Sequence, residues 1–543
     1  MYQIFQVKSV KYIFTSITIL LVIFSCARRG NPTGGDKDET APIMVVANPP
    51  YKTINFDSNN IRLEFDEFIK LKDVNKQLII SPPLKNRPII TPVGTASKYI
   101  NIKLNDTLLA NTTYTFNFGN AIEDNNEGNK LEHFKYVFST GKYIDSLTFK
   151  GNVLDAFKRD SLKNISVLLY EVNEKFNDST IYKEKPTYVA NTLDTIHFSL
   201  SNLKKGTYFV VALEDESNNY LFNPKSDKIG YKNEYITLPK DSILKEPLKL
   251  FFETQPFKLS KPKEESKGKI IFGYSGKNEN LKINLISKVD DSFTSNLIPE
   301  KEKDTLNYYW FSNQKIDSLK FIVSNSSFID TLTVKLKKKK QDSLKISSNI
   351  SGTLHLNDSL LLNTNIPISK IDTSKISFID KDTLNVDYQL RKNSANQLYF
   401  SFKKKEKNSY KITALPNAFI DIFNSKNDTL TYNFRTKGIE DYGSISLDLS
   451  VENGHNVIVQ LLDKKQNIIQ NKSINSSQLL IFNKLLPKNY LIKFIVDKNK
   501  NGKWDTGNYL LKTQPERTVF FPKVLNIRAN WELKETFTIK KAL

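Results

Sequence analysis

The sequence is poor in cysteine, methionine, histidine and tryptophan. Its 543 residues include one Cys, two Met, four His and three Trp. A single thiol cannot form an intrachain disulfide or a thiolate metal cluster, so neither can hold this chain together. Aromatic residues, by contrast, make up 11% of the chain, with 35 Phe and 24 Tyr. This balance argues against long helices and favours half-buried pleated strands, on which aromatic side chains pack well.

Catalytic signatures are also lacking. The chain has no HExxH, GxSxG, Walker A or GxGxxG motif. The four histidines are far apart, at His133, His197, His355 and His455. His197 and His355 alternate with apolar residues, so we expect both to point away from the core face of a strand. The carboxylates Glu64, Asp66 and Glu67 are predicted to lie on a solvated strand face. The sequence therefore predicts no enzyme and no required cofactor.

The first 26 residues carry an export signal. Lys8 and Lys11 precede an uncharged, apolar run from Tyr12 to Ser25, which is shorter than the roughly 20 residues that a membrane-spanning helix needs. Ile23-Phe-Ser-Cys26 resembles a lipobox, which implies that residues 1–25 are a cleaved signal peptide and that the Cys26 thiol is diacylated. The alternative is an incidental thiol in an ordinary secreted protein.

Lipidation would place the protein on the outer membrane of a cell envelope. Several acyl chains give stable attachment, since each buried CH₂ contributes ~0.8 kcal/mol. Residues 26–41 are polar and glycine-rich, and are predicted to form a flexible tether. Arg28 and Arg29 come before the acidic stretch 36–39, so the sequence leaves the periplasmic and the surface-exposed location both open.

The net charge of +21, with a pI of about 9.4, is strongly basic. The lysines are scattered along the chain, and the densest run is 337–340. An exported protein does not meet nucleic acid, so we predict no nucleic-acid partner. Two interpretations of the charge remain open, which are codon bias toward lysine and attraction to anionic envelope polymers.

Most of the chain after residue 42 alternates between apolar and polar residues with period two. Ile61 to Asp66 is one example, and Tyr99 to Leu104 and Thr113 to Phe118 are others. No long window has the 3.6-residue period of a helix. Short alternating segments separated by Asn, Asp, Gly and Pro predict an all-β protein made of antiparallel β-sandwiches.

Two repeats divide the chain. Tyr114, Tyr136, Phe138 and Thr140 recur 296 residues later, and Leu200, Leu203, Tyr208, Asp215 and Asn219 have counterparts 282 residues later. We therefore predict five modules in the order A, B, C, A′, B′. Their bounds are 42–143 for A, 145–254 for B, 269–344 for C, 345–438 for A′ and 440–535 for B′, with a linker at 255–268. No fold is predicted for C beyond its β content.

Module A resembles the bacterial Ig-like domain of the SbsA S-layer type. The matching segments are Asn48-Pro-Pro50, Ile61 to Glu67, Tyr114 to Phe118 and Tyr136 to Gly141. Module B resembles prealbumin-like, carboxypeptidase-regulatory-like sandwiches. The whole arrangement resembles a lipoprotein family common in Bacteroidota. The resemblance implies Ig-like and prealbumin-like sandwiches that serve as structural or binding units, without indicating a ligand.

One loop has the spacing of a calcium site. Asp497, Asn499, Asn501 and Asp505 occupy positions 1, 3, 5 and 9 of a calcium-type loop, with Gly502 at the sharp turn. Position 12 is Asn508 rather than Glu, so the bidentate carboxylate is missing. The sequence allows two interpretations, a weak Ca²⁺ site and an Asx-rich turn stabilised by its own hydrogen bonds.

Two functions fit these observations. The first is a non-enzymatic envelope lipoprotein that acts as a structural, adhesive or assembly scaffold on the outer membrane. The second is an accessory lipoprotein of a surface complex that binds carbohydrate or another polymer, for which Trp310 is a candidate platform. Envelope proteins or glycans are the expected partners.

Overall fold

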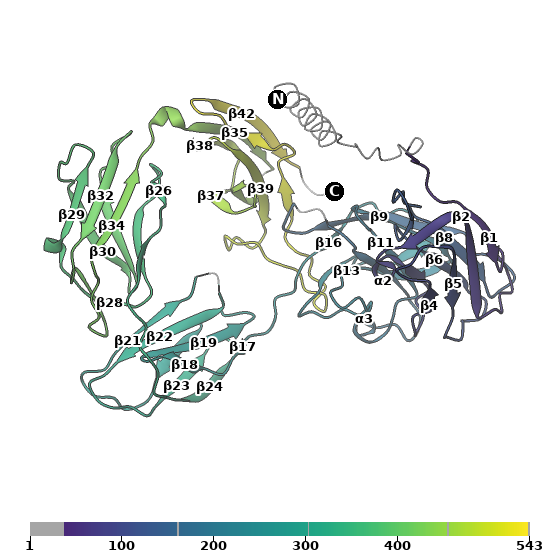
Figure 1. The fold of residues 1–543 in the computed structure, drawn as a ribbon, viewed down its shortest axis with the longest axis horizontal. Helices are drawn as coiled ribbons and strands as arrows, with labels where there is room; N and C mark the ends of the chain where they lie inside the picture. The colour runs from purple at the N-terminus through teal and green to yellow at the C-terminus, as the bar shows by residue number, and fades with distance from the viewer. Residues whose placement is uncertain (1–36, 160–161, 302, 453–454, 541–543) are drawn as a thin grey trace, which may run out of the picture. The chain divides into compact units, whose positions relative to one another are not determined.

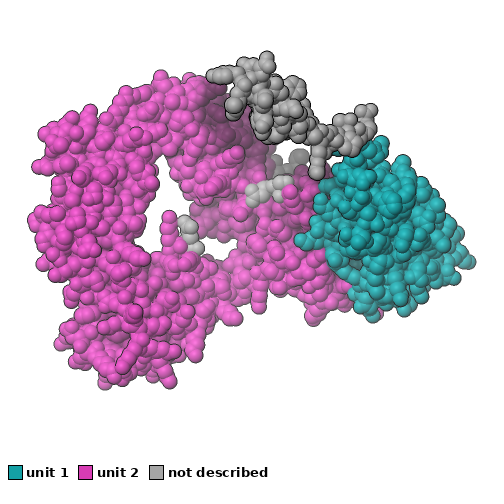
Figure 2. Space-filling view, in the orientation of Figure 1, with its two compact units in different colours: residues 1–145 teal, residues 146–543 magenta. Residues whose placement is uncertain are grey.

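The computed structural model describes residues 37–159, 162–301, 303–452 and 455–540. Cys26, the signal peptide and most of the tether lie outside them. The described chain is built almost entirely of short strands (Figure 1), which confirms the all-β prediction. It divides into two compact units, residues up to Asp145 and residues from Ser146 (Figure 2). Within the described residues, no helix combines the length and apolarity needed to cross a membrane.

Module A is a sandwich of two antiparallel sheets. One sheet has the order β1-β2-β5-β4, with β7 paired to β2, and the other has the order β3-β6-β8. The elements are β1 (Met44–Asn48), β2 (Asn60–Leu71), α2 (Val74–Gln77), β3 (Ile79–Ser81), β4 (Ile89–Thr91), β5 (Ser97–Lys103), β6 (Thr113–Asn117), β7 (Ile122–Asp124) and β8 (Lys135–Ser139). Ile61, Leu63 and Phe65 of β2 face the core, as their alternation predicts.

Module B has a three-stranded sheet, β12-β9-β16, and a larger sheet, β11-β10-β13-β14, in which β15 also pairs with β13. Its last strand, β16, runs parallel to β9. The elements are β9 (Leu147–Asp155), β10 (Ser166–Glu171), α3 (Thr180–Lys183), β11 (Tyr188–Asn191), β12 (His197–Leu203), β13 (Gly206–Glu214), β14 (Lys228–Tyr231), β15 (Ile236–Leu238) and β16 (Leu248–Leu250).

Segment C is also made of two sheets, β17-β19-β22-β21 with β18 on β19, and β20-β23-β24. The strands are β17 (Lys258–Leu259), β18 (Lys263–Ser266), β19 (Lys269–Ser275), β20 (Lys282–Leu285), β21 (Thr294–Pro299), β22 (Thr305–Phe311), β23 (Ser318–Ser324) and β24 (Ile329–Lys335). Two of these strands, β17 and β18, lie inside the stretch 255–268 that composition predicts to be a linker, so this stretch is part of the sheet.

Module A′ repeats the plan of A. The order β25-β27-β31-β30 corresponds to β1-β2-β5-β4, and β29-β32-β34 corresponds to β3-β6-β8, with β26 added beside β34 and the pair β28-β33 apart. The elements are β25 (Ile346–Ser348), β26 (Gly352–Thr353), β27 (Leu360–Thr364), β28 (Ile368–Ile371), η1 (Thr373–Lys375), β29 (Ile376–Asp380), β30 (Tyr388–Ser394), β31 (Gln397–Phe402), β32 (Ser409–Ala414), β33 (Phe419–Asp421) and β34 (Leu430–Arg435).

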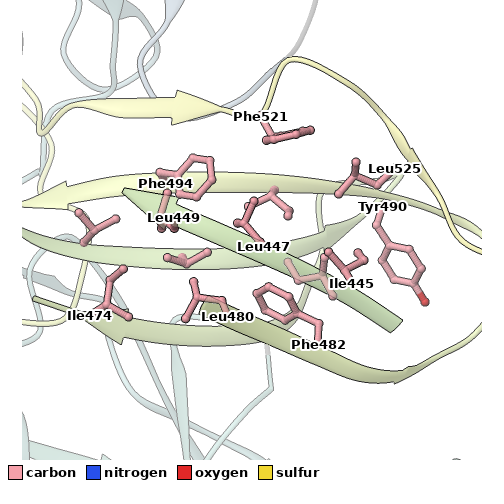
Figure 3. Close-up of a cluster of buried hydrophobic side chains, with 14 of the residues drawn as sticks. Ile445, Leu447, Leu449, Ile474, Leu480, Phe482, Tyr490, Phe494, Phe521 and Leu525 are labelled. Carbon is pink, nitrogen blue, oxygen red and sulfur yellow. The ribbon is translucent and has the colours of Figure 1, made fainter. Parts of the chain in front are cut away.

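Module B′ repeats B strand for strand, with the orders β38-β35-β42 and β37-β36-β39-β40, and with β41 on β39. The last strand, β42, is again parallel to the first, β35. The elements are η2 (Ile439–Asp441), β35 (Gly443–Val451), β36 (Asn456–Asp463), β37 (Ile468–Ile474), β38 (Gln478–Leu485), β39 (Asn489–Asp497), β40 (Thr518–Phe520), β41 (Leu525–Asn526) and β42 (Glu532–Ile539). Its buried aliphatic and aromatic side chains lie together between the strands (Figure 3).

The repeated residues make the same hydrogen bonds in both copies. The Tyr114 hydroxyl accepts the Leu109 N–H at 2.9 Å, and the Tyr410 hydroxyl accepts the Lys405 N–H at 2.8 Å. The prealbumin-like pair matches as well, since Tyr208 donates to the Lys204 carbonyl and Tyr490 to the Leu486 carbonyl, each at 3.0 Å. The repeat positions are therefore buried tyrosines whose hydroxyls fix a loop to the sandwich.

Candidate functional site

The candidate site is the loop between β39 and β40, residues 498–517, which we call the docking loop. It begins where Asp497 ends β39 and is nearly inaccessible. One Asp497 oxygen accepts the Asn501 N–H at 3.1 Å, and the other accepts the Gly502 N–H at 2.9 Å. Gly502 has a φ of +75°, a conformation that favours glycine. The first half of the loop is thus an Asx-type turn around Asp497.

The four predicted calcium ligands lie close together in this turn. The side-chain amides of Asn499 and Asn501 donate to Asp505 Oδ2 at 2.6 and 2.8 Å. In this arrangement the two amide N–H₂ groups, not the amide oxygens, point at the carboxylate. Among the described residues, no three His, Cys, Asp or Glu side chains form a group that could hold a metal ion. Calcium binding at this loop therefore stays a prediction.

A further carboxylate of the loop, Glu516, did not stand out in the sequence. It is buried, and it accepts the backbone N–H of Lys498 at 2.7 Å and of Asp505 at 3.2 Å. Burial raises the pKa of Glu516, and the neighbouring carboxylates of Asp505 and Asp497 raise it further. The sequence signal is an acid just before the return strand in both copies, since Asp227 of module B accepts the Glu216 N–H in the same way, at 3.3 Å.

The second half of the docking loop leaves its own module and packs on module B. Trp504 packs against the Phe157 ring with 4.7 Å between centroids, and its indole N–H donates to the Glu516 carbonyl at 3.0 Å. The Thr506 hydroxyl donates to the Phe252 carbonyl at 2.6 Å. At Gly507 an added Cβ would lie 2.5 Å from the Phe251 ring, so only glycine fits this approach.

Tyr509 is the anchor of this contact. Its side chain is fully buried among the module B rings of Tyr182, Phe209 and Tyr231, at centroid distances of 6.1, 5.9 and 5.2 Å. Its N–H donates to Glu253 Oε1 at 2.5 Å. Burial raises the pKa of the Tyr509 phenol far above its usual range. A buried aromatic side chain of this kind contributes several kcal/mol when it is well packed.

Polar contacts surround the anchor. The Tyr231 hydroxyl lies 3.1 Å from the carbonyl oxygens of both Asn508 and Thr513. Lys512 forms an ion pair with Asp178 at 2.5 Å. These bonds satisfy the carbonyl groups of a tight turn, 508–513, that would otherwise lose water on docking.

A second cluster extends the contact to the sheet of B′. The Arg159 guanidinium donates to the carbonyls of Phe521 and Pro522 at 3.2 and 3.0 Å. Lys493 of β39 is buried, and its Nζ lies 3.3 Å from the centroid of the Phe157 ring. Burial lowers the pKa of Lys493 to about 8, although the nearby Asp155 carboxylate acts in the opposite direction. The sequence gave no signal for these contacts.

The other residues considered in the sequence do not converge on a site. His197 is exposed and lies 2.7 Å from the Asn152 side-chain oxygen, whereas His355 is partly buried against Tyr442. Glu64 pairs with Arg62 at 2.7 Å. Asp66 accepts the Ile43 N–H at 2.8 Å, so it stabilises the first strand. The indole of Trp310 stacks on Phe293 against the core of segment C rather than forming an open platform.

Comparison with known proteins supports the fold. Residues 38–140 match the family of the bacterial Ig-like domain, which confirms the resemblance found for module A. No curated protein matches the chain.

Three solved structures illustrate the likeness in fold. The Bacteroides ovatus mixed-linkage glucan utilization locus protein SGBP-B is 10% identical, covering 70% of this chain and 94% of its own, with a TM-score of 0.19. Surface layer protein SbsC, domains 1–6, is 11% identical over 90% of this chain and 67% of its own, with a TM-score of 0.15. The Bacillus cereus pilin subunit BcpA is 8% identical over 73% and 100%, with a TM-score of 0.15.

Proposed function

With a bacterial Ig-like domain at residues 38–140, we propose that this chain is a non-enzymatic lipoprotein of the cell envelope that serves as a structural, adhesive or assembly scaffold. The observation that carries the proposal is the docking loop. It fixes module B′ on module B across about 185 intervening residues (254 to 440) by burying Tyr509 and several backbone groups. A scaffold has to hold its modules at defined separations, and interlocked sandwiches meet that requirement.

The lipid anchor at Cys26 is the part of the proposal that sets the location. We expect radiolabelled palmitate to enter the wild-type chain and globomycin to block its processing, because the segment 1–26 has the order of a lipoprotein signal. Cys26→Ser should lose the label and move from the membrane to the soluble fraction. Ser25→Ala, which keeps a small residue before the cysteine, is the matched control. Labelling of the Cys26→Ser chain would contradict the anchor.

Protease treatment of intact cells tests which face of the outer membrane carries the protein. Cleavage in intact cells places the modules on the surface, whereas cleavage only after the outer membrane is opened places them in the periplasm. Either result limits the set of envelope partners with which a scaffold can assemble.

We also propose that the docking loop binds Ca²⁺ weakly, roughly in the 10⁻⁴–10⁻³ M class of extracellular modules. Asp497, Asn499, Asn501 and Asp505 would supply oxygens, and Glu516, which binds the Asp505 N–H, adds a carboxylate beside them. Binding requires both asparagine amides to turn their oxygens toward the ion. Calorimetry with millimolar Ca²⁺ should give heat for the wild type and little for Asp505→Asn. No heat and no thermal shift for the wild type would exclude the ion.

The second candidate function is binding of a carbohydrate or another polymer as an accessory of a surface complex. Trp310 does not support it, because its ring packs into segment C. An exposed polar face in module A′ does support it.

A further inference from the structure

Module A′ has an open concavity on one sheet. Its volume is about 410 Å³, and its lining comes from all four strands of the sheet β26-β34-β32-β29 or from residues next to them. The residues whose side chains stand on this face are Ile379, Lys381, Ser409, Lys411, Asn433 and Arg435. Gly352 of β26 closes one side without a side chain, and an added Cβ there would meet no atom within 4 Å. The sheet face is therefore accessible across its width, about 14 Å for three inter-strand spacings.

The face is cationic and lacks counter-charges. Lys411 pairs across strands with Asn433, and Arg435 pairs with Ser409, so the two cations are diagonal neighbours with about 7–8 Å between them. Among the residues that the structure describes, Lys381, Lys411 and Arg435 have no carboxylate within ion-pair distance. The nearest acid of the lining, Asp380, is buried and already paired with Lys405 at 3.1 Å.

The equivalent strands of module A carry no such charge. At the 296-residue offset, Thr115 stands in place of Lys411, and Ser139 stands in place of Arg435. Both module A residues are buried, whereas Lys411 and Arg435 are exposed. Uncompensated like charges on neighbouring strands destabilise a sheet. Because the same framework folds with neutral residues at these positions, the fold does not require the cations.

The chemistry of the lining identifies the ligand class. A guanidinium binds a carboxylate through two parallel hydrogen bonds, and an ammonium adds a point charge. The Ser409 hydroxyl and the Asn433 amide can bind sugar hydroxyls between the charges. The two aromatic residues of the lining, Tyr410 and Phe434, are buried, so the face offers no ring on which a nucleobase could stack.

From this combination we infer that the β26-β34-β32-β29 face of module A′ binds an acidic polysaccharide, with Lys411 and Arg435 holding its carboxylates. The site deepens the second candidate function and does not depend on the lipid anchor. A failure of Cys26 labelling would leave it unaffected, and a failure of glycan binding would leave the anchor unaffected.

The test is titration of the full chain in non-ionic detergent with polygalacturonate, and with dextran as a neutral glycan. We expect polygalacturonate to bind, dextran not to bind, and binding to weaken as salt shortens the range of the charges. Lys411→Thr with Arg435→Ser installs the module A residues, so the sheet is expected to fold. This double variant should lose affinity by about tenfold or more, since two charge-assisted contacts are removed.

A matched control removes the same charge elsewhere. Lys338→Gln with Lys339→Gln lowers the net charge by two in the densest basic run of the chain and should change the affinity less than twofold. Lys411→Arg with Arg435→Lys keeps the charge and should retain most of the binding. Equal losses in both double variants would show that only the overall charge attracts the polymer and would overturn the site. Equal binding of dextran, no binding of polygalacturonate, or tighter binding of single-stranded nucleic acid would overturn it as well.

Discussion

The loops that follow β13 and β39 start from the same framework and reach different neighbours. In module B, Asp215 ends the strand region, its carboxylate accepts the Tyr220 N–H at 2.7 Å, and the loop closes at Asp227 before β14. In module B′, Asp497 and Glu516 have the same two positions, but 19 residues separate them (516 − 497), compared with 12 in module B (227 − 215). The extra seven residues form the turn that carries Tyr509 into module B. A duplicated sandwich has therefore acquired a contact with its own copy by lengthening one loop.

The comparison also separates two kinds of carboxylate role. Asp227 and Glu516 each fix the base of a loop by binding backbone N–H groups, and both loops need this role. Contact with another module needs Gly507, Tyr509 and Lys512, which only the longer loop contains. Changes at the base should thus affect one module, and changes at the tip should affect the contact between modules.

The largest expected effect is at the anchor. Tyr509→Ala removes a fully buried aromatic side chain and should destabilise the B–B′ contact by about 3–5 kcal/mol. The measurement is urea unfolding followed by fluorescence in a background where Trp504 is the only tryptophan, because this indole packs on Phe157 of module B. Leu511→Ala, in the same turn but 77% exposed, is the control and should cost less than about 0.5 kcal/mol. Equal effects would mean that the tip does not dock.

A smaller effect is expected where the loop passes Phe251. Gly507→Ala places a Cβ 2.5 Å from that ring and 2.7 Å from the Thr513 carbonyl oxygen, so the loop has to shift at a cost of about 1–3 kcal/mol. Gly502→Asn is the control, since the space around it is open and asparagine tolerates a positive φ. The same fluorescence assay should report a change for Gly507→Ala and little change for the control. The reverse order would place the tight approach at the wrong end of the loop.

The sequence predicted the fold better than it predicted the site. Period-two alternation fixes which side of each strand is buried, so the sandwiches and their duplication follow from residues such as Ile61 and Leu63, or Tyr208 and Tyr490. Composition alone was misleading at 255–268, because Glu264 and Ser266 face inward and bind the Lys337 N–H and the Asp342 carboxylate. Polar residues are compatible with a buried strand when partners elsewhere satisfy their hydrogen bonds.

The docking of Tyr509 could not be predicted for a different reason. Its partners Phe209 and Tyr231 are about 280–300 residues away in sequence, and no local pattern records such a contact. The Asp and Asn spacing at 497–505 was visible, but spacing alone does not tell whether the amide oxygens or the amide nitrogens point inward. Glu516 was overlooked because it lies outside the twelve positions of a calcium-type loop.

An intermediate effect tests how closely the two copies agree. Tyr208→Phe and Tyr490→Phe each remove one hydroxyl that donates to a loop carbonyl at 3.0 Å. Both variants should lose about 1 kcal/mol of folding free energy, because a neutral buried hydrogen bond contributes about that amount. Thermal unfolding by calorimetry compares them directly. A loss that differs by more than about 1 kcal/mol between the copies would contradict their structural equivalence.

The smallest effect at neutral pH is expected for Lys493→Met. The buried ammonium gains about 0.5–2 kcal/mol from the Phe157 ring, and this gain offsets part of its desolvation, so the variant should differ little from the wild type at pH 7. The pH dependence is the sharper measurement. Burial lowers the native pKa to about 8, whereas the unfolded value is about 10.4.

Between these two values the unfolded chain binds a proton that the native chain has released, so the stability of the wild type rises with pH through this window. Below pH 8 both states are protonated, and the cost of burying the charge is present in full. The unfolding free energy of Lys493→Met minus that of the wild type should therefore fall from pH 8 to pH 10.4, while other titrating groups cancel in the difference. A flat difference would mean that Lys493 meets water in the native state and that module B does not cover β39.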